Sequence, residues 1–286
     1  MGMIDIHTHV ISEDTETYPL APLGGTQSVW SKDRPVGVAG LLKAMDDAGV
    51  TQAVVVQAST AYGFDNRYVA DSVDAHPSRL VGVCCVDFLQ DTAVAQLEYW
   101  IKQRRFVGCR LFSTGSTLPE QGEWLDDPRA DAAWGWAEEE RLPVCVQMQS
   151  AGVPQLRKVL ERHPDLVLVL DHAARPNLSG GDPYPEAGDV FALAEFPEIY
   201  LKLTSNTFRR AEEHPGGARK LVRRLADIFG AERIAWGSNF PATAGSLPEL
   251  RARAEAAVVE LSAEEQVAFF GETAGRVYKE LAGGRE

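Results

Sequence analysis

The chain has 286 residues, of which 45% are hydrophobic and 24% charged, so it has apolar material for a large core. Its formal net charge of −13 argues against a nucleic-acid-binding protein, which normally carries a basic face. No apolar run approaches the roughly 18 residues that a membrane span requires, which argues against a membrane protein. The four cysteines lie in apolar runs without a C-x-x-C motif, which indicates reduced thiols and predicts a cytoplasmic location.

The N-terminal stretch M-G-M-I-D-I-H-T-H-V places two of the six histidines, His7 and His9, at the end of a short β-branched run. Such a run favours a strand, and strand side chains alternate with a period of two. His7 and His9 are therefore predicted to share one face, with Asp5 one layer deeper as a structural hydrogen-bond acceptor. Two imidazoles so placed can hold a metal ion or an anionic substrate, or can simply form a polar pair at an exposed edge.

Seven further apolar runs follow the first, separated by amphipathic stretches. Near-continuous β-branched runs are typical of parallel strands that are buried on both faces. Eight strand–helix units in about 240 residues predict a single (β/α)8 barrel, distorted, that makes up one α/β domain over residues 1–286. A doubly wound open sheet is the alternative, but no G-x-G-x-x-G follows the first strand. The eight predicted strands are 3–7, 53–58, 80–86, 106–112, 143–148, 166–172, 199–204 and 234–239.

Two segments outside the strands are also informative. The long loop over residues 11–35 is either a lid over a site or a variable loop. Ser262 and Glu265 have the spacing of a capping box, which predicts a closing helix that ends near Leu281.

Polar residues that end barrel strands meet at one mouth, where barrel enzymes hold their active sites. His7, His9 and His172 are predicted to line this mouth. Arg110 lies amid apolar neighbours, and a buried Arg is costly unless paired, so a substrate carboxylate is its expected bidentate partner. Lys202 is interpreted in the same way. The other predicted contacts at the strand ends are Gln57, Ser59, Gln149, Arg175 and Asn239.

The chain resembles the amidohydrolase superfamily and, within it, the branch of 2-pyrone-4,6-dicarboxylate lactonase and sugar lactonases. The matching stretches include D-I-H-T-H-V, G-C-R-L-F, L-D-H-A-A-R-P, Y-L-K-L-T and W-G-S-N-F-P, one per strand. The resemblance implies a barrel that hydrolyses a lactone with water. In that branch an acid at the end of strand eight activates the water, histidines of strands one and six polarise the carbonyl, and the strand-four Arg holds carboxylates.

Two departures from the superfamily pattern affect the predicted chemistry. Strand five has Q-M-Q where relatives have a metal-binding His, which leaves no required metal, or one divalent ion, zinc first, on His7, His9 and His172. Asn239 stands where W-G-S-D supplies the acid, and an amide cannot take a proton from water. A histidine or a bound metal must replace it, or activity is weak; Asp87 is a remote substitute.

The favoured hypothesis is a hydrolase of a small, carboxylated lactone or related cyclic ester. The predicted partner is a small molecule, with no nucleic acid and no membrane, and a homo-oligomer is left open. A metal-dependent decarboxylase of the same superfamily is the first alternative. A non-catalytic ligand-binding descendant, in which Asn239 marks lost chemistry, is the second.

Overall fold

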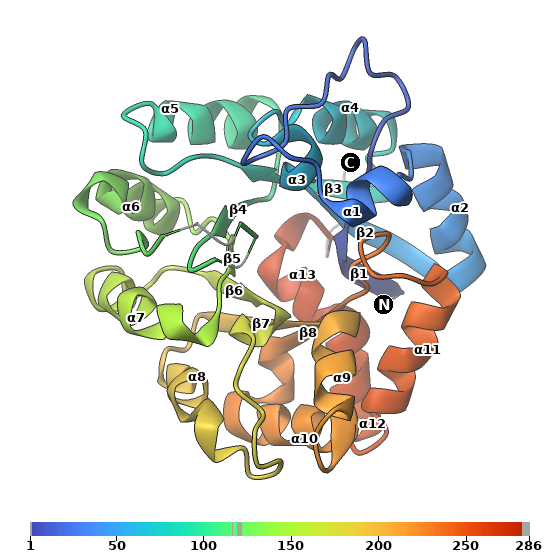
Figure 1. Ribbon diagram of the computed structural model, residues 1–286, viewed down its shortest axis with the longest axis vertical. Coiled ribbons are helices and arrows are strands. Elements are labelled where there is room, and N and C mark those ends of the chain that lie inside the picture. Colours follow the sequence, from blue (N-terminus) through green and yellow to red (C-terminus); the bar gives the residue numbers. More distant parts are fainter. Residues whose placement is uncertain (1, 116, 119–121, 282–286) are drawn as a thin grey trace.

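The computed structural model describes residues 2–115, 117–118 and 122–281, which form a (β/α)8 barrel (Figure 1). Eight parallel strands form one sheet in the order β1 to β8, so each strand pairs with its sequence neighbour. The predicted fold class is therefore confirmed. The strands are β1 (Met3–Thr8), β2 (Val50–Val56), β3 (Leu80–Cys85), β4 (Gly108–Phe112), β5 (Val144–Gln147), β6 (Leu168–Asp171), β7 (Ile199–Thr204) and β8 (Ile234–Gly237).

The α-helices surround the sheet as an outer ring, apart from α13 (Figure 1). They bury one face against the strands, as in α10, whose Leu221, Leu225 and Phe229 recur every four residues on the buried side. The helices are α1 (Val29–Asp33), α2 (Val38–Ala48), α3 (Ser59–Tyr62), α4 (Arg67–Ala75), α5 (Ala93–Glu98), α6 (Asp131–Glu139), α7 (Val153–Arg162), α8 (Gly188–Ala192), α9 (Ser205–Glu212), α10 (Gly217–Phe229), α11 (Leu247–Ala257), α12 (Ala263–Val267) and α13 (Thr273–Val277). None of the helices in the described ranges is long and apolar enough to cross a membrane.

The strands have apolar side chains on both faces, as their continuous β-branched sequences predict. In β2, Val54 and Val56 belong to the core inside the barrel, whereas Ala53 and Val55 pack outward against the helices. This alternation follows the two-residue period of a strand. The fold thus has an inner core and a larger core between the sheet and the helices.

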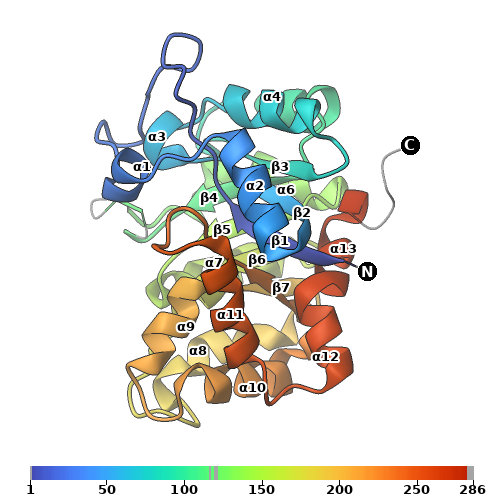
Figure 2. The same ribbon diagram turned by 90° about the vertical axis from the view of Figure 1, so that its right-hand side faces the viewer.

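The C-terminal segment closes one end of the barrel. Ser262 and Glu265 form the predicted capping box at the start of α12. The chain then runs through α13 to Tyr278, which is fully buried in the inner core, and its hydroxyl lies 3.2 Å from the Cys145 sulfur. Figure 2 shows α13 at the end of the barrel opposite α1 and α3. The site must therefore be at the other end.

The barrel closes between the segments that follow β1 and β8. The Asn239 amide donates to the His7 carbonyl at 2.8 Å, and the His9 amide donates to the Phe240 carbonyl at 2.9 Å. Two segments more than 230 positions apart thereby hold His9 and Asn239 beside each other at the mouth.

The long loop after β1 is tied down over the mouth. The Leu23 amide donates to the Ser59 carbonyl at 2.9 Å, and the Arg34 Nη2 donates to the Ala242 carbonyl at 2.9 Å. Because these bonds reach the segments after β2 and β8, the loop spans part of the barrel opening. It contributes Ser28 and Trp30 to the cavity described below, as the lid interpretation predicts.

Candidate active site

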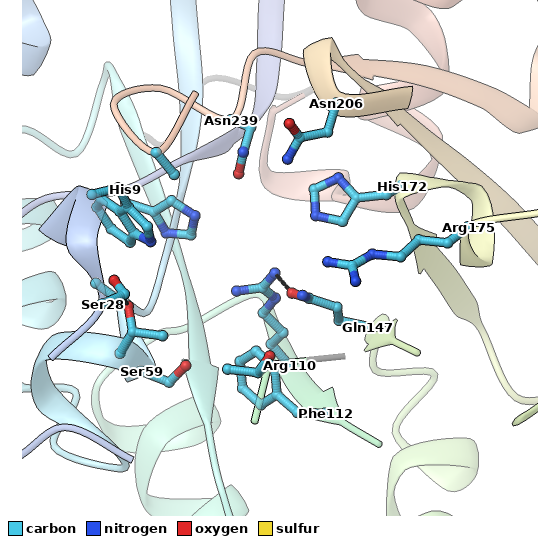
Figure 3. A pocket seen from close by; sticks show the side chains of 15 residues that line it. His9, Ser28, Ser59, Arg110, Phe112, Gln147, His172, Arg175, Asn206 and Asn239 are labelled. Atoms are coloured by element: carbon cyan, nitrogen blue, oxygen red, sulfur yellow. Dashed lines mark hydrogen bonds between the residues drawn. The ribbon is translucent and has the colours of Figure 1, made fainter. Parts of the chain in front are cut away.

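A cavity of about 250 Å³ lies at the carboxyl ends of the strands (Figure 3). Its wall includes residues from the ends of β1, β2, β4, β5, β6, β7 and β8, so it is the mouth predicted for the barrel. Six of the ten predicted site residues line it: His9, Ser59, Arg110, His172, Arg175 and Asn239. The other four, His7, Gln57, Gln149 and Lys202, do not.

His9 is held in one orientation by the end of the neighbouring strand. Its Nδ1 lies 2.8 Å from the Val56 carbonyl oxygen, and its ring packs against Trp30 with centroids 5.2 Å apart. Burial, together with the positive charge of Arg110, lowers the pKa of His9 to about 3. The imidazole is therefore neutral near pH 7.

His172 faces the same cavity from the other side (Figure 3). Its Nδ1 lies 2.6 Å from the Thr204 hydroxyl oxygen at the end of β7. Burial lowers the pKa of His172 to about 3, and the charge on Arg110 adds to this effect against the opposing effect of Asp171. The cavity is thus flanked by two neutral imidazoles, each with Nδ1 bonded to the barrel.

A strained backbone segment places His172 and Arg175. The four residues from His172 to Arg175 have φ values of 56°, 54°, 56° and 48°, all in the left-handed region. Each such conformation costs a non-glycine residue roughly 1–2 kcal/mol. Ala173 and Ala174 are fully buried within this segment, while the residues at its two ends line the cavity. Strain of this kind concentrates at functional sites.

Arg175 supplies an uncompensated positive charge to the cavity. Within the described part of the chain its guanidinium has no ion pair or hydrogen bond to protein. Burial lowers its pKa, and the neighbouring charges of Arg210 and Arg110 lower it further. A guanidinium next to other cations favours an anionic ligand.

The layer beneath the cavity is an ion cluster centred on Asp171. Its carboxylate lies 2.7 Å from the Nε of Arg110 and 2.7 Å from the Nζ of Lys202, and Asp171 and Lys202 are fully buried. Burial raises the pKa of Asp171, but the charges on Lys202 and Arg110 outweigh it and hold the pKa well below its usual value. Arg110 also donates to Gln147. Lys202, predicted to contact substrate, does not line the cavity and is ion-paired with Asp171 below it.

His7 also belongs to this lower layer. Its Nδ1 lies 3.7 Å from the Asp171 carboxylate, and its ring centroid is 4.9 Å from that of His9 and 5.4 Å from that of His172. Neither ring nitrogen has a hydrogen-bond partner among the described residues. Burial and the charge on Lys202 lower the pKa of His7 well below its usual value. His7 thus lies behind the cavity wall.

Two predicted glutamine contacts hold loops instead of facing the cavity. The Gln57 side chain donates to the carbonyls of Gly63 and Asp65 at 3.3 and 2.6 Å. The Gln149 side chain is exposed and lies 3.5 Å from the Gly115 carbonyl. Gln147, two residues earlier, lines the cavity in place of Gln149.

The strand-eight position has a local reason to be asparagine. Asn239 has φ 61°, in the left-handed region that asparagine tolerates better than most residues, and its side chain donates to Thr243 at 2.9 Å.

Asp5 accepts the amides of His7 and Ser238 at 3.0 and 2.8 Å, as its predicted structural role requires. Burial raises the pKa of Asp5 to about 6.

Asp87 cannot substitute for the missing acid from its position in the fold. It accepts the Leu89 amide at 3.0 Å and the Gln90 side chain at 3.0 Å, and it is not part of the cavity wall.

Several cavity residues were missed because they lie beyond the strand ends. Asn206 is the second residue of α9 and lines the cavity, and Ser28, Trp30 and Thr60 come from the segments before and within α1 and α3. The sequence T-S-N directly after strand seven was the available signal for Asn206, because side chains that follow a barrel strand also reach the mouth.

The described residues do not fit a metal ion. They contain no group of three His, Cys, Asp or Glu side chains placed to hold one. The charges of Arg110 and Lys202 also oppose metal binding by the predicted ligands His7, His9 and His172. These charges lower the pKa of all three imidazoles and would repel a cation in the same way.

The model of the amidohydrolase family matches residues 4–279. The chain belongs to the amidohydrolase family. This amidohydrolase is 30% identical over 196 residues to an L-fucono-1,5-lactonase from Burkholderia ambifaria, an alignment that covers 68% of this chain and 66% of the relative, just under two thirds of its length.

Solved structures share its fold. A candidate 2-pyrone-4,6-dicarboxylic acid hydrolase from Pseudomonas putida has a TM-score of 0.79 and 24% identity, with 97% of each chain covered. An amidohydrolase from Burkholderia multivorans with bound zinc has a TM-score of 0.76 and 20% identity, with 98% of this chain and 99% of the other covered. That neighbour holds zinc, whereas the described residues of this chain contain no group of three His, Cys, Asp or Glu side chains placed to hold a metal ion.

Proposed function

We propose that this amidohydrolase opens a small, carboxylated lactone, or a related cyclic ester, with water. The observation that carries the proposal is the cavity itself, in which two neutral imidazoles, His9 and His172, share one space with the uncompensated cation Arg175. Neutral imidazoles can exchange a proton with water or with a carbonyl oxygen, and the cation can bind a carboxylate.

The cavity's size and lining support a single-ring substrate. A volume of about 250 Å³ is below the usual range for drug-sized ligands. Ser59, Thr60 and Asn206 offer hydrogen bonds to ring hydroxyls, and Asn239 can orient water or substrate. Because Arg110 and Lys202 both form ion pairs with Asp171, the carboxylate anchor in this proposal is Arg175.

The relatives support the same reaction class, since the Burkholderia ambifaria protein is an L-fucono-1,5-lactonase. The proposal assigns no step to a metal ion. It retains a cytoplasmic location, supported by four free and buried cysteines. A homo-oligomer is compatible with it.

A lactone panel tests the proposal. Neutral sugar lactones, carboxylated sugar lactones and 2-pyrone-4,6-dicarboxylate would be incubated with the wild type and with Asn239→Asp, and ring opening followed by acid release or NMR. We expect hydrolysis of at least one carboxylated lactone, and faster turnover by Asn239→Asp, because the introduced carboxylate can take a proton from water. If neither protein opens any carboxylated lactone, the proposed function is wrong.

A further inference from the structure

His9 and His172 look alike in the sequence, but their hydrogen-bond partners differ in kind. The partner of His9 Nδ1 is the Val56 carbonyl oxygen, at 2.8 Å. A carbonyl oxygen can only accept, so Nδ1 of His9 must carry the proton. Because the buried ring is neutral, its other nitrogen, Nε2, has no proton. His9 therefore presents a bare lone pair to the cavity that it lines.

The partner of His172 can both donate and accept, and the surrounding bonds decide which it does. Thr204 is the N-cap of α9, and its backbone N–H donates to the Thr207 hydroxyl at 3.3 Å. The Thr204 hydroxyl proton then needs an acceptor, since Thr204 is fully buried. Among the described residues the acceptor within reach is His172 Nδ1, at 2.6 Å. A neutral His172 that accepts at Nδ1 carries its proton on Nε2 and can donate into the cavity.

We propose that His9 is the general base that replaces the missing strand-eight acid, and that His172 is the hydrogen-bond donor to the developing oxyanion. This division of roles rests on the proposed lactone hydrolysis. It assigns opposite tautomers to two histidines on opposite sides of the cavity (Figure 3). Thr204 is a positioning residue, because it acts only through the tautomer of His172.

The reaction balances with these groups alone. The water oxygen bonds to the lactone carbonyl carbon while one water proton moves to His9 Nε2, and the carbonyl π electrons move to the oxygen that faces His172 Nε2–H. The tetrahedral intermediate then re-forms the carbonyl and breaks the ring C–O bond. The proton held by His9 passes to the leaving alkoxide, so lactone and water give a hydroxy acid.

The cations around His9 make its basicity depend on whether an anionic substrate is bound. Burial disfavours the imidazolium form of His9, and the charges of Arg110 and Lys202 disfavour it further. A substrate carboxylate bound at Arg175 adds a negative charge to the cavity and offsets them. His9 thus becomes a better base only when an anionic substrate is bound.

The tautomers can be read without any substrate. Long-range ¹H–¹⁵N correlation spectra of the full-length, ¹⁵N-histidine-labelled protein near pH 7 distinguish the two protonation sites of each ring. The signals are assigned by their loss in His9→Gln and His172→Gln. We expect His9 with the proton on Nδ1 and His172 with the proton on Nε2. A proton on His9 Nε2, or the same tautomer for both rings, overturns the proposal even if no lactone substrate is found.

A double-variant cycle tests the catalytic role. His9→Gln should lower kcat by about 10² to 10⁴-fold in the wild type, but by less than about 10-fold in Asn239→Asp, where the carboxylate takes over as base. Equal losses in both backgrounds contradict the role of His9. Thr204→Val should lower kcat more than it raises KM, and Thr204→Ser should keep the wild-type kcat. If neither the wild type nor Asn239→Asp opens any carboxylated lactone, the proposed function fails, while the spectra still decide the tautomers.

Discussion

The cavity wall and the layer directly beneath it are both rich in charged and polar residues, yet they are built differently. In the lower layer, Asp171 lies 2.7 Å from both Arg110 and Lys202, so the two cations share one carboxylate inside the protein. In the wall, Arg175 has no such partner among the described residues. The lower layer is an ion-paired cluster inside the protein, whereas the Arg175 cation above it is left for a ligand. The comparison indicates that the depth of a charged side chain along the barrel axis decides whether it forms an ion pair within the protein or is available to bind a ligand.

Removing the central carboxylate should give the largest effect on stability. Asp171→Asn leaves Arg110 and Lys202 buried without a counter-charge, which should lower the free energy of unfolding by about 3–5 kcal/mol. Denaturant unfolding measures the loss. Lys202→Met is the matched control and should cost less, because Asp171 then keeps Arg110 as its partner. A loss below about 1 kcal/mol for Asp171→Asn would show that the ion pairs of the lower layer do not stabilise the fold.

Removing the wall charge should change binding and not stability. Arg175→Gln should raise KM for a carboxylated lactone roughly 10- to 100-fold, since hydrogen bonds to a charged group contribute about 1.5–3 kcal/mol. Steady-state kinetics on carboxylated and neutral lactones give the measurement. Arg209→Gln, an exposed arginine of α9, is the control and should leave KM unchanged. If the two variants give the same KM, Arg175 is not the anchor.

The two wall histidines should make the protein less stable in acid. Each is neutral when folded, with a pKa of about 3, but takes a proton in the unfolded chain below about pH 6.5. The unfolded state therefore binds more protons between pH 3 and 6.5, and the free energy of unfolding falls as the pH drops through this range. At pH 5 the loss is on the order of 1–2 kcal/mol for each histidine.

Denaturant unfolding of the wild type and His172→Gln at pH 7 and pH 5 checks this effect. The variant should lose less stability than the wild type. Asp5 acts in the opposite direction, because burial raises its pKa to about 6 and its folded form takes up a proton first. The difference between the two proteins is therefore the relevant quantity, and an identical pH slope in both would contradict the neutral state of His172.

The smallest effect is expected at the loop that covers the wall. Trp30→Ala removes the ring packed 5.2 Å from His9 and should lower kcat/KM about 2- to 10-fold, since aromatic pairs contribute about 0.5–1.5 kcal/mol. Trp30→Phe keeps a ring and should retain most of the activity. Equal activity in the wild type and Trp30→Ala would exclude the loop from the working site.

Much of the fold could be predicted because its signal is local. Each strand is a short β-branched run with both faces buried, as Val54 and Val55 show on the two sides of β2. The end of each run then points to the mouth. His9, His172 and Arg110 were found in this way, since strand order and strand ends place them without any knowledge of packing.

How deep each charged side chain lies at the mouth, and which way it points, could not be predicted in the same way. Lys202 follows the same sequence pattern as the wall residues, but the register that pairs Asp171 with Lys202 holds it in a buried ion pair below the cavity. In H-A-A-R, nothing local requires four left-handed residues, and their strain is tolerated only because the folded barrel holds them.

The amino-acid sequence alone determined the barrel, the residues at its mouth and the absence of a strand-eight acid. These features could be predicted because the periodic pattern of apolar residues and the chemistry of each side chain are properties of short segments. Only the tertiary structure decided which charges neutralise one another and which ring nitrogen of His9 and His172 faces the cavity. Those outcomes depend on contacts such as His9 with Val56 and His172 with Thr204, which join residues 47 and 32 positions apart in the chain.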